Sequence, residues 1–327
     1  MKRREFILTG AAMTIPVVAR AQHYPKLRRI GFLTSASRPE SMQTSYLSAF
    51  PGAMRELGYI EGRDFAIEWR FAEGRLERFT EFAEELVRLN VDVFVWGTPT
   101  AVPAVRQATQ SIPIVMGYST DPVGNGFIAS LARPGGNITG LASSQEDAAP
   151  KQLELLMTAI PNVSRVGLLV DPTSPNSLPI VKNAQVAAES LALVLLPIEA
   201  RSLNTMEDAF AALVKEHVKA VMVLTASVTF FNRDRIAELA SRYRLPSVFS
   251  LREFVQAGGL MSYGESLLDF HHRAASYVDK IFKGAQPADL PVEQPTRLFL
   301  VINRGTADKI GVAIPPTLLA RADEVIE

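Results

Sequence analysis

The chain contains no cysteine among its 327 residues. This absence excludes disulfide bonds, thiolate metal sites, cysteine nucleophiles and attachment of a lipid to a mature N-terminal cysteine. Histidine is also scarce, and of the four residues only His271 and His272 are close in sequence. Adjacent residues on a helix point about 100° apart, so we expect a solvated helix surface there and no metal site.

An excess of one charge is also lacking, because 34 Lys and Arg balance 34 Asp and Glu. The basic residues are scattered and form no stripe of the kind that nucleic-acid surfaces require, which excludes DNA and RNA as expected partners. With 47% hydrophobic residues, the chain is long enough for two ordinary α/β domains, each with its own core.

Recognisable catalytic motifs are absent too. There is no Gly-x-x-x-x-Gly-Lys phosphate loop, and the pair Gly124 and Gly126 lacks the third glycine of a dinucleotide site. No Gly-x-Ser-x-Gly elbow occurs, and acidic pairs such as Glu84 and Glu85 fall on the surface of an expected helix. We therefore expect no catalytic residues and no cofactor.

Residues 1–21 have the order of an export signal. Lys2-Arg3-Arg4 precedes an apolar run over residues 6–18, and Ala19-Arg20-Ala21 forms a small-x-small cleavage site. The run is too short to span a bilayer and Pro16 interrupts it. The paired arginines resemble a twin-arginine signal, while an ordinary secretory signal with two arginines by chance is the alternative.

Export without a long apolar run or a lipidated cysteine predicts a free, soluble protein. Such a protein is retained by a periplasm, so the expected location is the periplasm of a Gram-negative cell.

Strand and helix patterns alternate in the first part of the chain. Ile30 to Thr34 has the pattern of a short buried strand, and a polar turn follows it. Strands that alternate with helices are joined by right-handed crossovers into a parallel sheet. The expected strands cover 30–34, 65–71, 91–96 and 112–117, and the expected helices cover 41–57, 76–89 and 99–109.

The pattern restarts after residue 137. Residues 91–115 resemble residues 218–248, since each segment has the pattern of a strand, a threonine turn, a helix and an apolar strand with proline. This weak repeat predicts two similar lobes whose strand ends face each other. Further strands are expected at 166–170, 193–198, 220–224 and 298–302, and further helices at 151–159, 178–191, 206–217, 267–283 and 306–310.

Stretches rich in glycine or proline, at 133–140, 258–264 and 287–295, separate these patterns. They predict an α/β fold of two doubly wound parallel-sheet lobes joined by three hinge crossings, which can close on a ligand without unfolding either lobe. The expected first lobe comprises residues 22–139 and 262–295, and the expected second lobe comprises residues 140–261 and 296–327.

Polar side chains follow the expected strands of the first lobe. Thr34, Thr98 and Ser119 all fall at carboxyl ends of strands, where ligands bind in parallel α/β sheets. Thr98 is placed as the N-cap of a helix that begins at Pro99, so its turn offers a hydroxyl and backbone N–H groups to a carboxylate. Alternatively, Thr98 only caps its own helix.

Five segments give the sequence a resemblance to the substrate-binding proteins of ABC importers with the type I periplasmic fold. Within that family it resembles the branch whose members bind tryptophan, tyrosine or phenylalanine. The likeness covers nearly the whole mature chain. The segments are Ile112-Pro113-Ile114-Val115, Thr120-Asp121-Pro122-Val123-Gly124, Ser130-Leu131-Ala132-Arg133-Pro134-Gly135-Gly136-Asn137-Ile138-Thr139-Gly140, Ser262-Tyr263-Gly264 and Pro291-Val292-Glu293-Gln294-Pro295.

The resemblance implies a ligand between the lobes, contacted by turn residues. We expect Thr98 and Thr100 to take a carboxylate and Asp121 an ammonium, although Asp121 could instead be only a helix N-cap. Aromatic residues would pack on an apolar body, with simple hinge packing as the alternative for Tyr263. The full expected set is Ser35, Thr98, Thr100, Tyr118, Ser119, Asp121, Ser143, Thr225, Phe230 and Tyr263.

The function that the resemblance implies is capture of a small carboxylate, such as an aromatic amino acid or a related compound, for delivery to an ABC permease. We expect a monomer that binds without metal or cofactor. The alternative is a periplasmic sensor that presents its ligand to a membrane kinase or chemoreceptor. The turns 117–121 and 171–176 lie where this family varies, so the ligand itself stays open.

Overall fold

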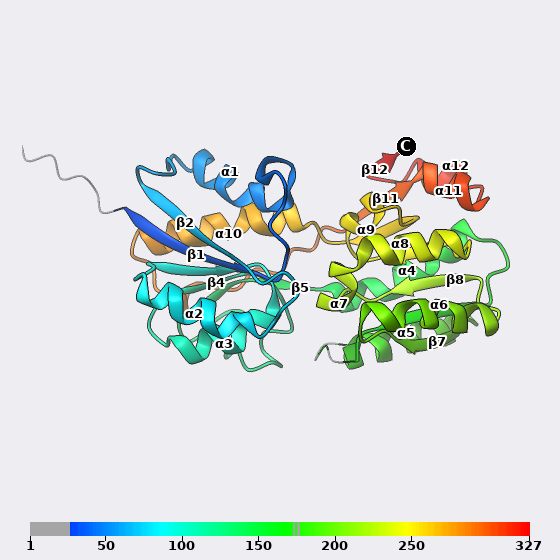
Figure 1. Cartoon of the computed structure of the whole chain (residues 1–327), viewed down its shortest axis with the longest axis horizontal. Helices are drawn as coiled ribbons and strands as arrows, with labels where there is room; N and C mark the ends of the chain where they lie inside the picture. The colour runs from blue at the N-terminus through cyan, green and yellow to red at the C-terminus, as the bar shows by residue number, and fades with distance from the viewer. Residues whose placement is uncertain (1–26, 173, 175–176) are drawn as a thin grey trace, which may run out of the picture.

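The computed structural model describes residues 27–172, 174 and 177–327. The chain forms two α/β lobes side by side (Figure 1), each built around its own sheet. The expected export signal lies outside the described residues. Within the described part of the chain, no helix is long and apolar enough to cross a membrane.

The first lobe contains a parallel sheet of five strands in the order β2-β1-β3-β4-β5. Successive residues of β3 point to opposite faces, so that Val93 and Val95 join one buried cluster while Phe94 and Trp96 join another. Both faces are therefore buried, as parallel sheets require. The strands are β1 (Arg28–Thr34), β2 (Phe65–Phe71), β3 (Val93–Trp96), β4 (Ile114–Thr120) and β5 (Ile138–Ser143).

Helices cover both faces of this sheet (Figure 1). On one face, helix α1 (Ala49–Glu56) packs against α10 (Leu267–Phe282), which returns from late in the sequence. On the other face lie α2 (Arg78–Arg88) and α3 (Val102–Ala108). The apolar positions of α10, such as Phe270 and Ala274, recur at helical spacing and face the sheet.

The second lobe repeats this plan with two added strands. Its sheet has the order β12-β11-β10-β9-β8-β6-β7, so β6 to β10 follow the same order as β1 to β5 of the first lobe. This agreement supports the repeat seen in the sequence, because β3 and β8 occupy equivalent places. The strands are β6 (Arg165–Val170), β7 (Val194–Glu199), β8 (Ala220–Val223), β9 (Ser247–Phe249), β10 (Met261–Gly264), β11 (Phe299–Asn303) and β12 (Glu324–Ile326).

The helices of the second lobe also divide between the two faces of its sheet. One group shares a buried cluster with Val221 and Val223, and comprises α6 (Leu203–Lys215), α8 (Arg233–Arg242) and α9 (Arg252–Gln256). The other group packs with Ala220 and Met222, and comprises α4 (Gln145–Ala159), α5 (Ser177–Ser190), α11 (Arg304–Ile310) and α12 (Pro316–Leu319).

Three crossings join the lobes, as the sequence predicts, at positions shifted by a few residues from the expected ones. Strand β5 stays in the first sheet to Ser143, so the first crossing follows residue 143 and not residue 139. Strand β10 belongs to the second sheet, so the second crossing lies at 264–267 and not near 261. The chain then pairs Glu293 with Leu141 before the third crossing at 294–298. Glycine runs thus mark strand edges and not the crossings themselves.

Two further details differ from the expected pattern. The predicted helix 41–57 is regular only from Ala49, because short 3-10 turns (Met42–Thr44 and Tyr46–Ser48) precede it. Strand β11 runs antiparallel to β10, so the second sheet is parallel except at this pair. The fold class is nevertheless that of two α/β lobes built on parallel sheets.

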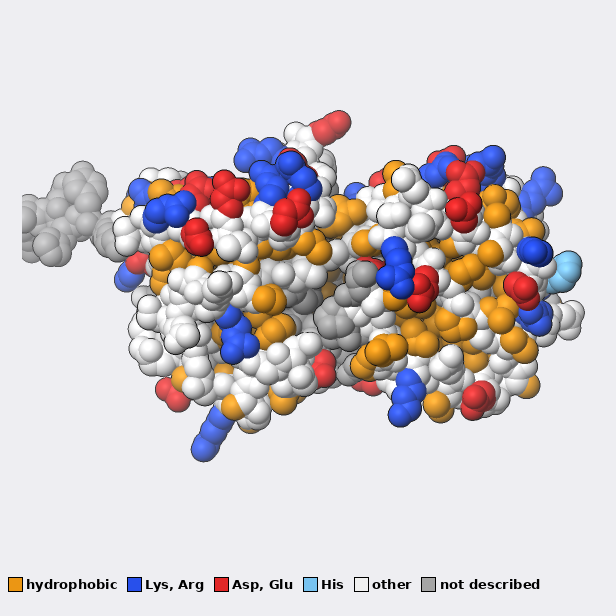
Figure 2. Space-filling view, turned by 60° about the horizontal axis from the view of Figure 1, so that its bottom comes forward, with side chains coloured by type: hydrophobic (Ala, Val, Ile, Leu, Met, Phe, Trp, Pro, Cys, Tyr) orange, Lys and Arg blue, Asp and Glu red, His pale blue; other side chains and the backbone are white. Residues whose placement is uncertain are grey.

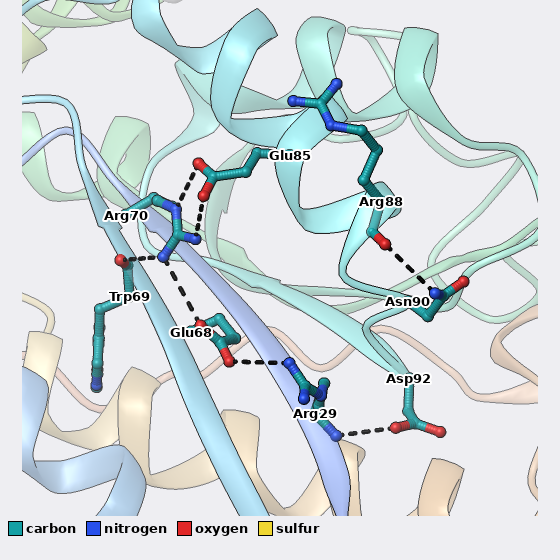
Figure 3. A network of polar contacts seen from close by, with 8 residues as sticks. All are labelled: Arg29, Glu68, Trp69, Arg70, Glu85, Arg88, Asn90 and Asp92. Carbon is teal, nitrogen blue, oxygen red and sulfur yellow. Dashed lines mark hydrogen bonds and ion pairs between the residues drawn. The ribbon is translucent and has the colours of Figure 1, made fainter.

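A surface network of charges joins the neighbouring strands β1 and β2 of the first lobe to α2 (Figure 3). Arg70 on β2 donates two hydrogen bonds to the carboxylate of Glu85, at 3.0 and 2.7 Å, and one to the backbone carbonyl of Trp69. Arg29 on β1 donates to Glu68 at 3.4 Å. The guanidinium of Arg70 holds the pKa of Glu85 below its ordinary value of 4.5.

We predict that Glu85→Gln lowers the free energy of unfolding by about 0.5–1 kcal/mol at neutral pH, because the bidentate pair is lost while solvent screens its half-exposed carboxylate. A carboxyl with a lowered pKa stabilises the fold above its ordinary pKa and loses that effect as pH falls. The difference should therefore shrink in acid. Urea unfolding at neutral and acidic pH measures this.

Glu84→Gln is the matched control, since Glu84 lies on the same helix and pairs with Arg88 only at 3.9 Å. Equal losses of unfolding free energy in the two variants would contradict a larger contribution from the pair of Arg70 and Glu85.

Candidate functional site

A cavity of about 460 Å³ lies between the lobes at the carboxyl ends of both sheets. Figure 2 shows a hollow at the junction of the lobes, with hydrophobic side chains on both sides of it. Its volume falls within the range of small-molecule sites. The lining residues are Ser35, Tyr46, Leu76, Gly97, Thr98, Thr100, Pro103, Tyr118, Thr120, Asn125, Phe127, Gln145, Ser174, Ile180, Thr225, Ala226, Ser227, Phe230, Leu251 and Leu267.

Hydroxyl groups of the first lobe gather at one part of the wall. Ser35 follows β1 and Thr98 follows β3, and these two strands are neighbours in the sheet. The hydroxyl oxygens of Thr98 and Thr100 are 3.1 Å apart, so both side chains point to the same place. Thr98 is only 6% exposed. In doubly wound sheets the strand order reverses at this point, and loops leave the sheet in opposite directions to form a crevice.

Aromatic rings form a second part of the wall, and neighbouring rings hold them in place. Tyr46 meets Phe230 across the lobes edge to face, with ring centroids 6.2 Å apart. Tyr118 meets Phe270 in the same manner at 5.1 Å. Phe127 packs at 6.3 Å from Trp96 of β3. Rings held in this way give a rigid apolar surface for a flat ligand.

The second lobe contributes side chains that follow β8 and β6. Thr225 and Ser227 come after β8, at the place where Thr98 and Thr100 come after β3 in the other lobe. The hydroxyl oxygen of Thr225 is buried and has no hydrogen-bond partner among the described residues. A buried hydroxyl without a partner is uncommon, and a ligand that occupies the cavity can satisfy it.

The structure brings together six of the ten residues expected from the sequence. The six that line the cavity are Ser35, Thr98, Thr100, Tyr118, Thr225 and Phe230. The four that do not line it are Ser119, Asp121, Ser143 and Tyr263.

Asp121 and Tyr263 are directed elsewhere by their local structure. Asp121 has a positive φ of 40°, and its carboxylate accepts a hydrogen bond from the Gly124 N–H at 2.8 Å. It is exposed and closes its own turn. Among the described residues no helix follows β4 before β5, so Asp121 is not the expected helix N-cap, and its carboxylate does not line the cavity as an ammonium site would require. Tyr263 packs against the core of the second lobe, as hinge packing requires.

Ser119 and Ser143 lie behind the wall. Ser119 is fully buried, and its hydroxyl has no partner among the described residues. Ser143 lies 3.4 Å from the hydroxyl of Tyr118 and donates to Glu265, so it supports a lining residue without reaching the cavity.

Several lining residues were not expected. Tyr46 falls within the expected helix 41–57, but a 3-10 turn replaces the regular helix there and Tyr46 lines the cavity. Gln145 is the first residue of α4, directly after the first crossing, and Phe127 follows the turn after β4. Both come after carboxyl ends of strands, which is the signal that could have identified them.

A buried polar network at the hinge supports the cavity wall. Glu265, at the second crossing, accepts hydrogen bonds from the Ser144 N–H at 2.7 Å and from the hydroxyls of Ser143 and Ser144. Tyr118 donates to the side-chain oxygen of Gln145 at 2.7 Å, and the amide nitrogen of Gln145 donates to Ser250 in the second lobe. The network thus joins two crossings, both lobes and two lining side chains.

Burial governs the ionisation of groups around the cavity. It raises the pKa of Glu265, although the hydrogen bonds from Ser143 and Ser144 oppose the effect. Burial also raises the pKa values of Tyr46 and Tyr118, so both phenols stay protonated. His271, behind Gly97, has its pKa lowered to about 4 by burial and is neutral. No group of three possible metal-ligating side chains occurs among the described residues.

Two α/β lobes of matching strand order, joined by three crossings around a cavity, define the type I class of periplasmic binding proteins. Residues 30–326 match the family model of ABC transporter substrate binding proteins. The chain belongs to that family, which confirms the family predicted from the sequence.

Three similar proteins illustrate the relationship. A curated tyrosine-binding protein of Clostridioides difficile is 25% identical over 258 residues, which are 79% of this chain and 74% of the relative. The structure of an ABC domain with L-Trp from Streptococcus pneumoniae has a TM-score of 0.83 at 26% identity, over 92% of this chain and all of the other. A conserved domain protein from Vibrio cholerae has a TM-score of 0.84 at 25% identity, with the same coverage.

We predict that Glu265→Gln gains stability relative to the unmodified protein as pH rises above 4.5, the ordinary pKa of a glutamate carboxyl. A carboxyl whose pKa is raised by folding stabilises the fold in its protonated form, and this contribution is lost as pH rises through the folded pKa. Glutamine does not ionise and avoids that loss. Urea unfolding over this pH range measures the difference.

Glu189→Gln, on the exposed surface of α5, controls for a change in net charge. The free energies of unfolding of the Glu265 variant and the unmodified protein should differ by an amount that changes with pH. A constant difference would contradict a buried carboxyl that ionises at the hinge.

Proposed function

We propose that the protein captures a small carboxylate with an aromatic body, in the class of aromatic amino acids and related compounds, and delivers it to an ABC import permease. The observation that carries this proposal is the cavity between the lobes, which combines hydroxyl groups on one part of its wall with fixed aromatic rings on another. The protein acts by binding, without a chemical step.

The hydroxyl groups suit the carboxylate end of the ligand. Thr98 and Thr100 present their oxygens side by side at the end of β3, and Ser35 follows the neighbouring strand. Each hydroxyl can donate one hydrogen bond to a carboxylate oxygen, and hydrogen bonds to a charged acceptor are stronger than neutral ones. We therefore assign the carboxylate to this corner of the cavity.

The aromatic rings suit the body of the ligand. Phe230 and Tyr46 face each other from different lobes, and Tyr118 and Phe127 complete an apolar wall. Burial of a flat ring between such side chains excludes water and contributes the larger part of the affinity. The relatives whose names include tyrosine or tryptophan support an aromatic ligand in this branch of the family.

The proposal extends to location and partners. Residues 1–21 have the order of an export signal with paired arginines, which supports release of a free protein into the periplasm. There it works as a monomer, because a hinge with three crossings closes within one chain. The permease in the inner membrane is the proposed recipient of the ligand.

A thermal-shift screen of the purified protein against aromatic amino acids, aromatic acids and aliphatic acids tests the ligand class. A ligand at 100 times its Kd adds about 2.7 kcal/mol of apparent stability. We expect aromatic compounds with a carboxylate to raise the melting temperature, and aliphatic acids of the same charge to leave it unchanged. A shift only with aliphatic acids or sugars would exclude the proposed class.

Thr98 provides a sharper prediction. Thr98→Val keeps the shape of the side chain and removes the hydroxyl, so we expect the aromatic carboxylate to bind about 1–2 kcal/mol more weakly, for one lost bond to a charged group. Thr98→Ser keeps the hydroxyl and should bind nearly as well as the unmodified protein. Isothermal titration calorimetry measures both, and equal affinities for all three proteins would leave Thr98 as a helix cap only.

A further inference from the structure

None of the described side chains that line the cavity is charged at neutral pH. Its polar members are hydroxyls and the amides of Asn125 and Gln145, and the remaining members are apolar, aromatic or glycine.

Four acidic residues near the cavity in the fold, Asp121, Asp171, Glu253 and Glu265, are not among its lining residues. Asp121 is exposed and closes its own turn, and Glu265 accepts hydrogen bonds from Ser143 and Ser144. Asp171 is 3% exposed at the end of β6 and does not border the cavity. Glu253 borders a separate cavity of about 390 Å³, and its carboxyl lies near Tyr46 and Tyr118, with one buried oxygen that has no hydrogen-bond partner among the described residues. Burial raises the pKa of Glu253, which favours the neutral carboxyl over the carboxylate that an ammonium requires.

One amide acceptor of the wall is already engaged. The side-chain oxygen of Gln145 accepts the hydroxyl of Tyr118 at 2.7 Å, and the amide nitrogen of Gln145 donates to Ser250. An α-ammonium group has three N–H donors to satisfy, and a buried cation without an anionic partner costs several kcal/mol. A carboxylate needs donors only, and the hydroxyls of Ser35, Thr98 and Thr100 supply them.

We propose that the preferred ligand is an aromatic carboxylate without an α-ammonium group. This inference rests on the proposed function, because it selects one substrate class within the aromatic carboxylates assigned to the same cavity. The carboxylate lies at the hydroxyl corner and the ring lies among Tyr46, Tyr118 and Phe230. An amino acid with the same ring must also bury its ammonium group without an anionic partner, which costs free energy, so it binds more weakly.

Matched pairs of compounds test the inference, because each pair differs only by the ammonium group. The pairs are L-phenylalanine with 3-phenylpropanoate, L-tyrosine with 3-(4-hydroxyphenyl)propanoate, and L-tryptophan with indole-3-propanoate. Titration calorimetry of the purified protein gives the Kd of each compound. We expect the propanoate to bind at least about ten-fold more tightly than its amino acid in the pair whose ring fits best.

The outcomes separate this inference from the proposed function. If the amino acid binds as tightly as its propanoate, or more tightly, in every pair that binds, the inference is wrong and the proposed function stands. If no member of any pair binds, both are wrong. Tighter binding of the propanoate supports both.

A variant that adds a carboxylate to the wall provides a second measurement. Ser227 lines the cavity at the start of α7 (Ser227–Phe231), a position that accepts an acidic side chain. We expect Ser227→Asp to raise the ratio of amino-acid affinity to propanoate affinity about ten-fold or more. Ser202→Asp, at the exposed N-cap of α6, makes the same charge change away from the cavity and should leave the ratio unchanged.

Melting temperatures check that both variants are folded. If the ratio of amino-acid affinity to propanoate affinity is then equal in Ser227→Asp and Ser202→Asp, the lack of a carboxylate in the wall does not determine the preferred ligand, and the inference is wrong.

Discussion

The buried carboxyl group of Glu265 is the contact on which the arrangement of the two lobes depends. It accepts hydrogen bonds from Ser143 and Ser144, so it fastens the second crossing to the first. Ser143 also contacts Tyr118, and Tyr118 donates to Gln145, which reaches Ser250 in the second lobe. Hinge and cavity wall are therefore one hydrogen-bonded unit, and a rotation of the lobes alters both together.

The two sheets explain why the cavity lies where it does. Because β1 to β5 and β6 to β10 share one strand order, each lobe has its crevice at the same place, and the crossings turn the two crevices toward each other. Thr98 and Thr225 are equivalent products of this repeat, each placed after the third strand of its sheet. A ligand held by both contacts the two lobes at once and stabilises their closed arrangement.

The sequence predicts those parts of the molecule that depend on local pattern. The strand at 65–71 is found at its expected bounds, because the alternation of apolar and charged side chains marks both of its ends. Thr98 and Thr100 line the cavity because they follow a buried strand. The remaining positions depend on backbone turns that no short pattern specifies. The positive φ of Asp121 turns its carboxylate outward, and the 3-10 turns around Tyr46 replace a helix whose apolar spacing looked regular. Gln145 reaches the cavity only because the first crossing follows Ser143.

One hydrophobic cluster continues from the first lobe into the second, and Tyr46 with Phe230 and Gly74 with Phe231 meet across the junction. Separation of the lobes would expose these rings to water, at a free-energy cost that scales with the apolar area uncovered. These contacts therefore favour the arrangement in which the two lobes meet. When contacts of this kind favour the arrangement that binds ligand, the apparent affinity comes closer to the intrinsic one. A polar substitution of Phe231, which does not line the cavity, should thus change the affinity from a position that does not touch the ligand.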